Sequence, residues 1–158
     1  MKPTENSPPD YDRAFEHALK LLGIRKRTVR QLHHKLSEKG FAAAAVSEVL
    51  SRLQENKLLD DEEFARAYVS EKTAIHPAGK RKMLQDLKRK GVGQEAAGRA
   101  VSELDENYEF NMAFKLGQGK AQLLSHVDPR KRKKKVYDYL MRKGFHSEVC
   151  MEVIKGIR

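Results

Sequence analysis

Apolar residues recur along this chain with the i, i+3, i+4, i+7 spacing of a buried face on an amphipathic helix. No stretch alternates apolar and polar residues for long enough to predict a strand. The helical pattern is repeated after 51 and then 53 residues, and its copies are Val46, Val49, Leu50, Leu53; Ala97, Ala100, Val101, Leu104; and Cys150, Val153, Ile154, Ile157. It predicts an all-α fold that contains repeats.

A second helix is predicted before each copy, and it ends at a Lys-Gly pair followed by a bulky apolar residue. These endings are Lys39-Gly40-Phe41, Lys90-Gly91-Val92 and Lys143-Gly144-Phe145. Glycine directly after a helix is typical of a left-handed C-terminal cap, and lysine beside it complements the negative end of the helix dipole. Each Lys-Gly pair therefore predicts a helix end.

A third helix is predicted at the start of each unit. Its matching residues are Phe15, Ala18, Leu19; Phe64, Ala67, Tyr68; and Phe110, Ala113, Phe114. The chain then divides into a mobile tail at 1–10 and three-helix repeats at 11–57, 58–106 and 107–158, nine helices in all. Units this short bury little apolar surface alone, so stacked neighbours are expected to supply the core. A compact single globule remains the alternative.

Helix starts are marked by capping residues. Thr28 followed by Gln31 has the spacing of a capping box. Asp60 precedes an acidic first turn, and Asp128-Pro129 fits a cap followed by the first helical position. These signals predict helices that begin directly after Thr28, Asp60 and Asp128.

Two further expectations concern helix faces and interruptions. In the first helix, roughly 11–23, Leu19 and Leu22 are expected to point inward with Phe15. In the seventh helix, Gly117 and Gly119 are expected to cause a kink or an early end, because glycine is a weak helix former.

The net charge of the chain is more positive than solubility requires. The 158 residues carry a formal charge of +10, and 34% of them are charged. Such a balance favours a polyanion or an acidic protein surface as partner. The chain has one cysteine, no apolar run long enough to cross a membrane and no signal-like start, so we expect a cytoplasmic protein without disulfides.

No spacing of residues in the sequence indicates an active site. The six histidines show no metal-ligand spacing, and the acids cluster at helix starts, where capping explains them. Gly117-Gln118-Gly119-Lys120 lacks the full phosphate-loop pattern, and Cys150 occupies a core position of the repeat. We therefore expect a protein that is not an enzyme and has no catalytic residue, metal or cofactor.

Positive charge is concentrated in the middle helix of each unit. The stretches 25–39, 80–90 and 130–143 carry net charges of +5, +5 and +7, so the rest of the chain is net negative. One such run is as well explained by a solvated helix face, but three at the same repeat position favour a shared surface. The candidate partner-binding and DNA-binding residues are Arg25, Lys26, Arg27, Arg30, Lys35, Lys39, Lys80, Arg81, Lys82, Lys88, Arg89, Lys90, Arg130, Arg132, Lys133, Lys134, Arg142 and Lys143.

These residues form a continuous positive strip only if the middle helices face the same side of the molecule. Such a strip suits a phosphate backbone or an elongated partner. Since Phe and Tyr fall mostly on the apolar stripes, base stacking has little support and we expect sequence-tolerant contact. A nucleic-acid-binding module and a passive scaffold with a solubilising basic face are the functional alternatives.

The chain resembles the RecX family, the regulatory proteins of the bacterial recombinase RecA. The resemblance rests on Leu32 and Leu36 before Lys39-Gly40-Phe41, on Leu58-Leu59-Asp60-Asp61 before Phe64-Ala65, on Gly79 and Arg81 with Leu87 before Lys90-Gly91, and on Leu140 before Lys143-Gly144-Phe145. It covers nearly the whole chain after residue 12.

The resemblance implies an elongated, curved array of three-helix repeats with no chemistry of its own. It further implies binding to the RecA filament on single-stranded DNA, with restraint of filament growth, ATP hydrolysis, strand exchange and the coprotease activity that triggers the SOS response. The expected partners are therefore the RecA filament and single-stranded DNA, with double-stranded DNA as a second candidate. No membrane is expected, and the chain should act as a monomer.

Overall fold

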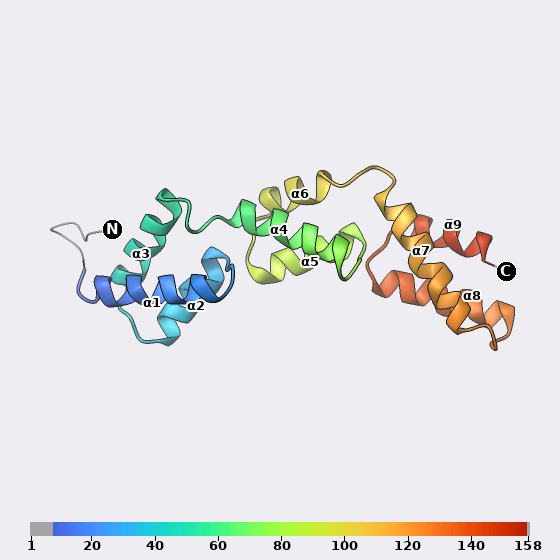
Figure 1. The fold of residues 1–158 in the computed structure, drawn as a ribbon, viewed down its shortest axis with the longest axis horizontal. Helices are drawn as coiled ribbons and strands as arrows, with labels where there is room; N and C mark the ends of the chain where they lie inside the picture. Colours follow the sequence, from blue (N-terminus) through green and yellow to red (C-terminus); the bar gives the residue numbers. More distant parts are fainter. Residues whose placement is uncertain (1–7, 158) are drawn as a thin grey trace.

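The computed structural model describes residues 8–157, and within that range α-helices are joined by turns and short connections, with no strand, as predicted. Figure 1 shows an elongated molecule in which three three-helix units follow one another along the long axis. The helices are α1 (Tyr11–Ile24), α2 (Val29–Glu38), α3 (Ala43–Glu55), α4 (Asp61–Ala74), α5 (Lys80–Lys90), α6 (Gln94–Ser102), α7 (Tyr108–Leu123), α8 (Pro129–Arg142) and α9 (Ser147–Gly156).

Most of the predicted tail lies outside the described residues. Residues 8–10 belong to the expected segment 1–10, and they form a turn that leads into α1. The Tyr11 amide donates to the Pro8 carbonyl at 3.1 Å. The remaining residues of that expected segment are not described.

Each unit has a hydrophobic core of its own, which differs from the expectation that stacked neighbours supply one. Within each unit the three helices pack against one another. Leu36 and Leu53 are buried in the core of the first unit, and Leu87 and Val101 are buried in the core of the second unit. In the third, Phe145 is fully buried. The apolar faces of the three helices suffice to enclose a small core, so the units meet through other contacts.

The three Lys-Gly endings have the left-handed caps that the sequence predicts. Gly40, Gly91 and Gly144 have φ values of 91°, 95° and 86°. In the first copy, the Gly40 amide donates to the Ser37 carbonyl at 3.0 Å, and the Phe41 amide donates to the Leu36 carbonyl at 3.3 Å. Both bonds recur at the equivalent positions of the other two units, as in a Schellman motif.

The predicted N-terminal caps are also confirmed. Thr28 and Gln31 form a reciprocal capping box, in which the Thr28 Oγ1 accepts from the Gln31 amide at 3.1 Å. Asp60 and Asp128 each accept two amide hydrogens from the first turn of α4 and α8. Pro129 occupies the first turn of α8.

Two expectations about helix faces and glycines were wrong in part: Leu22 packs against the core as expected, but Leu19 does not, and α7 does not end early. Leu19 is 41% exposed, because the buried face of α1 is formed instead by Tyr11, Ala14, Phe15 and Ala18. The helix α7 does not end early but continues through both glycines to Leu123. A Cβ at Gly117 would lie 2.9 Å from Val153 Cγ1, so this glycine permits close packing against α9.

The first and second units meet where the start of α2 abuts the end of α5. The Thr28 hydroxyl donates to the Lys90 carbonyl at 2.6 Å. The guanidinium of Arg30 donates to the Arg89 carbonyl and to the Lys88 carbonyl, the latter at 3.4 Å. The Arg89 and Lys90 carbonyls belong to the last turn of α5, where helix carbonyls lack an amide partner within the helix, so the preceding unit caps α5. We call this contact the first joint.

The second joint repeats this arrangement between the start of α5 and the end of α8. The Gly79 amide donates to the Lys143 carbonyl at 2.9 Å, and the guanidinium of Arg81 donates to the Met141 carbonyl at 3.0 Å. The donor arginine and acceptor carbonyl occupy the same repeat positions as Arg30 and the Lys88 carbonyl in the first joint.

The two joints place the middle helices end to end in the order α8, α5, α2, along one side of the molecule (Figure 1). We call these three helices the middle-helix row. At each joint the negative end of one helix dipole meets the positive end of the next, which stabilises the alignment. The Lys-Gly endings of the second and third units are therefore contacts between units as well as helix stops.

Replacing Thr28 with alanine should lower the free energy of unfolding by about 1–2 kcal/mol, because the cap and the bond to the Lys90 carbonyl are both lost. Thr28 is fully buried, so water cannot replace the hydroxyl. Urea denaturation followed by circular dichroism measures the change. Thr28→Ser keeps the hydroxyl and should lose less than half as much; an equal loss in both variants would contradict this role for the hydroxyl.

Candidate functional site

The structure divides the eighteen candidate cations into those that point freely into solvent and those that hold the fold together. One group is exposed and makes no ion pair or side-chain hydrogen bond with any described residue. We call this group the open cations: Arg25, Lys39, Lys88, Arg130, Lys134 and Arg142. Five of them lie on the middle-helix row or directly after α2, and Arg25 lies in the α1–α2 connection.

A second group is engaged at or near the joints. Arg30 and Arg81 donate to main-chain carbonyls of the neighbouring unit, as described above. Lys26 forms an ion pair with Glu63 on α4, across the same first joint. Arg27 is buried and donates to the Leu21 carbonyl at 3.4 Å, and its burial and the nearby Arg25 lower its pKa.

A buried carboxylate holds two more of the candidate cations. Asp86 on α5 pairs with Arg89 and with Lys82, the latter at 3.5 Å, and accepts a hydrogen bond from the Tyr68 hydroxyl at 2.7 Å. Burial alone would raise the Asp86 pKa, but the hydrogen bonds from Tyr68 and Arg89 and the charge of Lys82 lower it. This carboxylate thus engages two of the six cations that the sequence places on α5.

The lysines of the second and third Lys-Gly pairs lie over tyrosine rings. Lys90 lies 5.7 Å from the ring centroid of Tyr68, and Lys143 lies 5.8 Å from that of Tyr139. At these distances the ammonium is attracted to the face of the ring. Lys35 pairs with Glu38 at 3.3 Å in the last turn of α2. The side chains of Lys80 and Lys133 are half-buried and have no such partner among the described residues.

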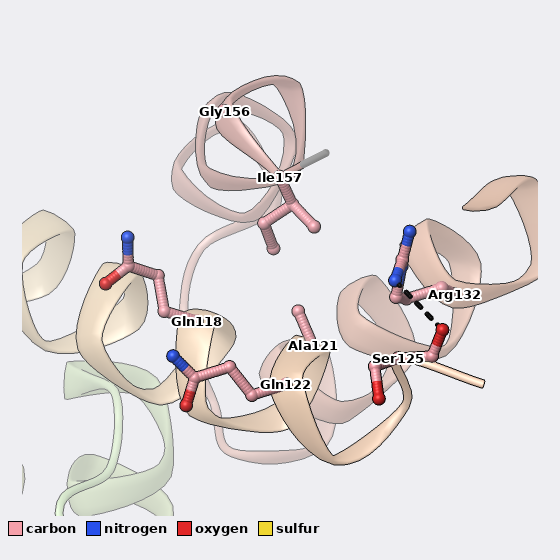
Figure 2. Close-up of a pocket in the computed structure, with 7 residues that line it drawn as sticks. All are labelled: Gln118, Ala121, Gln122, Ser125, Arg132, Gly156 and Ile157. Carbon is pink, nitrogen blue, oxygen red and sulfur yellow. Dashed lines mark hydrogen bonds between the residues drawn. The ribbon is translucent and has the colours of Figure 1, made fainter. Parts of the chain in front are cut away.

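Arg132 is half-buried and lines a pocket of about 410 Å³ in the third unit. Figure 2 shows its guanidinium directed at the end of α7, where it donates to the Ser125 carbonyl at 3.5 Å. The Ile157 side chain points into the same pocket, between Arg132 and Gln118. The Arg132 Nε is buried without a hydrogen-bond partner in the described part of the chain.

Sequence reasoning missed two acids that act at the joints. Asp61 accepts from the Val29 amide at 2.9 Å across the first joint, and its burial raises its pKa although that hydrogen bond lowers it. Glu109 is buried and accepts from the Lys80 amide and from the His146 amide, the latter at 3.2 Å. Both acids lie in the first turn of a helix, where acids favour the positive end of the helix dipole. That explanation was sufficient for the sequence, so it gave no reason to expect a contact between units.

No group of three or more His, Cys, Asp or Glu residues within 8–157 is placed to hold a metal ion. Cys150 is fully buried, as predicted, and its burial raises the pKa of the thiol. A buried neutral thiol is a poor nucleophile. None of the helices described is long and apolar enough to cross a membrane.

The end-to-end units and the cations on one row define a tandem three-helix repeat protein with a basic surface. Family models of the RecX first, second and third three-helix domains match residues 14–53, 60–101 and 106–154. The chain belongs to the RecX family, as its resemblance predicted.

Individual relatives agree with this membership. The regulatory protein RecX of Chlorobium limicola is 37% identical over 141 residues, which are 89% of this chain and 87% of the relative. The regulatory protein RecX of Amycolatopsis mediterranei is 31% identical over 156 residues, which are 98% of this chain and 89% of the relative. The crystal structure of RecX from Lactobacillus salivarius shares the fold, with a TM-score of 0.85 at 22% identity over 94% of this chain and 96% of that one. The relatives from Chlorobium limicola and Amycolatopsis mediterranei are named regulatory proteins, not enzymes, in agreement with the expectation for this chain.

Proposed function

We propose that this chain regulates the RecA recombinase, mainly as an inhibitor, by binding the RecA filament on single-stranded DNA. In doing so it restrains filament growth, ATP hydrolysis, strand exchange and coprotease activity, and thereby modulates DNA repair and the SOS response. It acts in the cytoplasm as a monomer. Its membership in a family of regulatory proteins supports the regulatory part of this proposal.

The middle-helix row is the observation that carries the filament-binding part. Its open cations are distributed over all three units, from Lys39 after α2 to Arg130 at the start of α8. Spaced cations suit a repeating polyanion such as filament-bound DNA or an acidic recombinase surface. Because the units are joined in one array, several weak contacts can act together, and avidity can exceed the affinity of each contact.

ATP hydrolysis by RecA on single-stranded DNA tests the proposal. The chain should reduce the steady-state rate when it is present at far fewer copies than RecA, because one array bridges several protomers and stops growth at the filament end. The control measures binding to the same DNA without RecA, across a salt series. An unchanged rate at equimolar chain would contradict the proposal.

A second candidate function, a nucleic-acid-binding module that acts without a recombinase, is favoured by the same open cations. Salt-dependent binding to naked DNA together with an unchanged RecA ATPase rate would support this candidate.

A further inference from the structure

A pocket of about 530 Å³ opens at the first joint, beside the middle-helix row. One wall comes from Arg30 at the start of α2. The others come from α5, its Lys-Gly ending and the first turns of α6. The residues that line it are Arg30, Leu84, Gln85, Lys88, Gly91, Val92, Gln94 and Ala97.

The pocket exists because the second unit has small residues where the third unit has larger ones. Val92 takes the repeat position of Phe145, and Ala97 takes that of Cys150. Both of the third-unit residues are fully buried in their core. At the position of Leu84 the third unit has Tyr137, which packs against its core, whereas Leu84 packs against none. The matching place at the second joint thus has larger side chains than the first.

Leu84 is an unusual residue for this surface. It is 38% exposed, and among the large exposed apolar residues of the described chain it is the one on the middle-helix row. Leu84, Val92 and Ala97 give the pocket an apolar floor, while Arg30 and Lys88 are exposed at its edge. No carboxylate lines the pocket, so its charge is uncompensated.

We propose that this pocket binds an apolar side chain of a partner protein that carries a carboxylate next to it. The apolar side chain would cover Leu84 and Val92, and the carboxylate would pair with Arg30 or Lys88. A phosphodiester backbone meets the charge but leaves the apolar floor uncovered, so a protein segment is the better fit. The inference rests on the proposed function in one respect: the partner is the regulated recombinase.

Leu84→Gln tests the pocket in the filament, because it removes apolar lining without changing charge. Its binding to RecA filaments should weaken by about threefold to tenfold, because the complex buries the exposed part of Leu84 and would bury a polar amide in its place. Binding to naked single-stranded DNA should stay within about twofold of the unmodified chain. Leu123→Gln, at a position that is 73% exposed and lines no part of this pocket, is the matched control and should bind normally.

A peptide titration tests the pocket without the recombinase. The probe is acetyl-Glu-Leu-Glu-amide, and the control is acetyl-Lys-Leu-Lys-amide. The methyl resonances of Leu84 and Val92 should shift with the acidic peptide and not with the basic one. Equal shifts with both peptides, or none with either, would overturn the pocket's proposed chemistry. A response to the acidic peptide without any effect on RecA would count against the proposed function alone.

Unchanged filament binding by Leu84→Gln would overturn the inference even if the unmodified chain inhibits RecA strongly. A parallel loss of filament binding and naked-DNA binding in this variant would overturn it too, because the pocket would then contact nucleic acid. Thermal unfolding of both variants establishes that they are folded, and the exposure of Leu84 makes a large loss of stability unexpected.

Discussion

Replacing Gly79 with alanine should separate the second and third units of the array. A Cβ at this position would overlap the main-chain carbonyl of Gly144 and the amide of Phe145. The obstacle is backbone, so no side-chain rotation relieves it. The expected result is loss of the Gly79–Lys143 hydrogen bond and a more extended, flexible molecule, with about 1–3 kcal/mol of destabilisation. Small-angle X-ray scattering measures the extension.

Gly93 provides a matched control for this variant. Both glycines precede a helix with nearly the same backbone, φ −70° at Gly79 and φ −64° at Gly93. A Cβ at Gly93 would meet nothing within 4 Å, so Gly93→Ala should leave the scattering profile unchanged. Identical profiles for Gly79→Ala and the unmodified chain would show that the second joint does not hold the units together.

The helices and their ends follow from local sequence rules. Thr28 and Gln31 are three residues apart, so their capping box is visible in the sequence. Gly40 adopts the left-handed conformation that ends α2, as its position predicts. The joints could not be predicted in this way. The carbonyl that Arg30 reaches is 59 residues away, and no spacing rule connects them.

The candidate site was predicted less completely for the same reason. Charge counts locate the middle helices correctly, but they do not distinguish Lys88, which is open, from Arg81, which caps the neighbouring unit. In the sequence, Asp86 is a single acid among many cations, yet in the folded chain its carboxylate pairs with both Lys82 and Arg89. Partners at a distance therefore decide which cations remain available.

Reversing three open cations should weaken filament binding strongly. The variant is Lys88→Glu, Lys134→Glu and Arg142→Glu, which leaves the joint-forming Arg81 and the Asp86 partner Lys82 in place. Each residue is exposed and has no ion pair in the described chain, so folding should be preserved. If each contacts one phosphate, the loss removes three counterion-releasing contacts and lowers affinity by about tenfold or more at physiological salt.

The matched control reverses three cations outside the row. Lys20, Arg66 and Lys155 lie on α1, α4 and α9, and all three are exposed. Reversing them changes the net charge of the chain by the same amount. Non-specific electrostatics predicts equal losses for the two variants, whereas a binding row predicts a loss for the first alone.

The most direct test of the row is the salt dependence of binding to RecA filaments on single-stranded DNA. For each triple variant and the unmodified chain, the slope of log affinity against log salt concentration would be measured. The row predicts that reversing Lys88, Lys134 and Arg142 makes the slope shallower by about 2, while the control triple keeps the original slope. Equal slopes for both triple variants would contradict the assignment of the middle-helix row as the filament-binding surface.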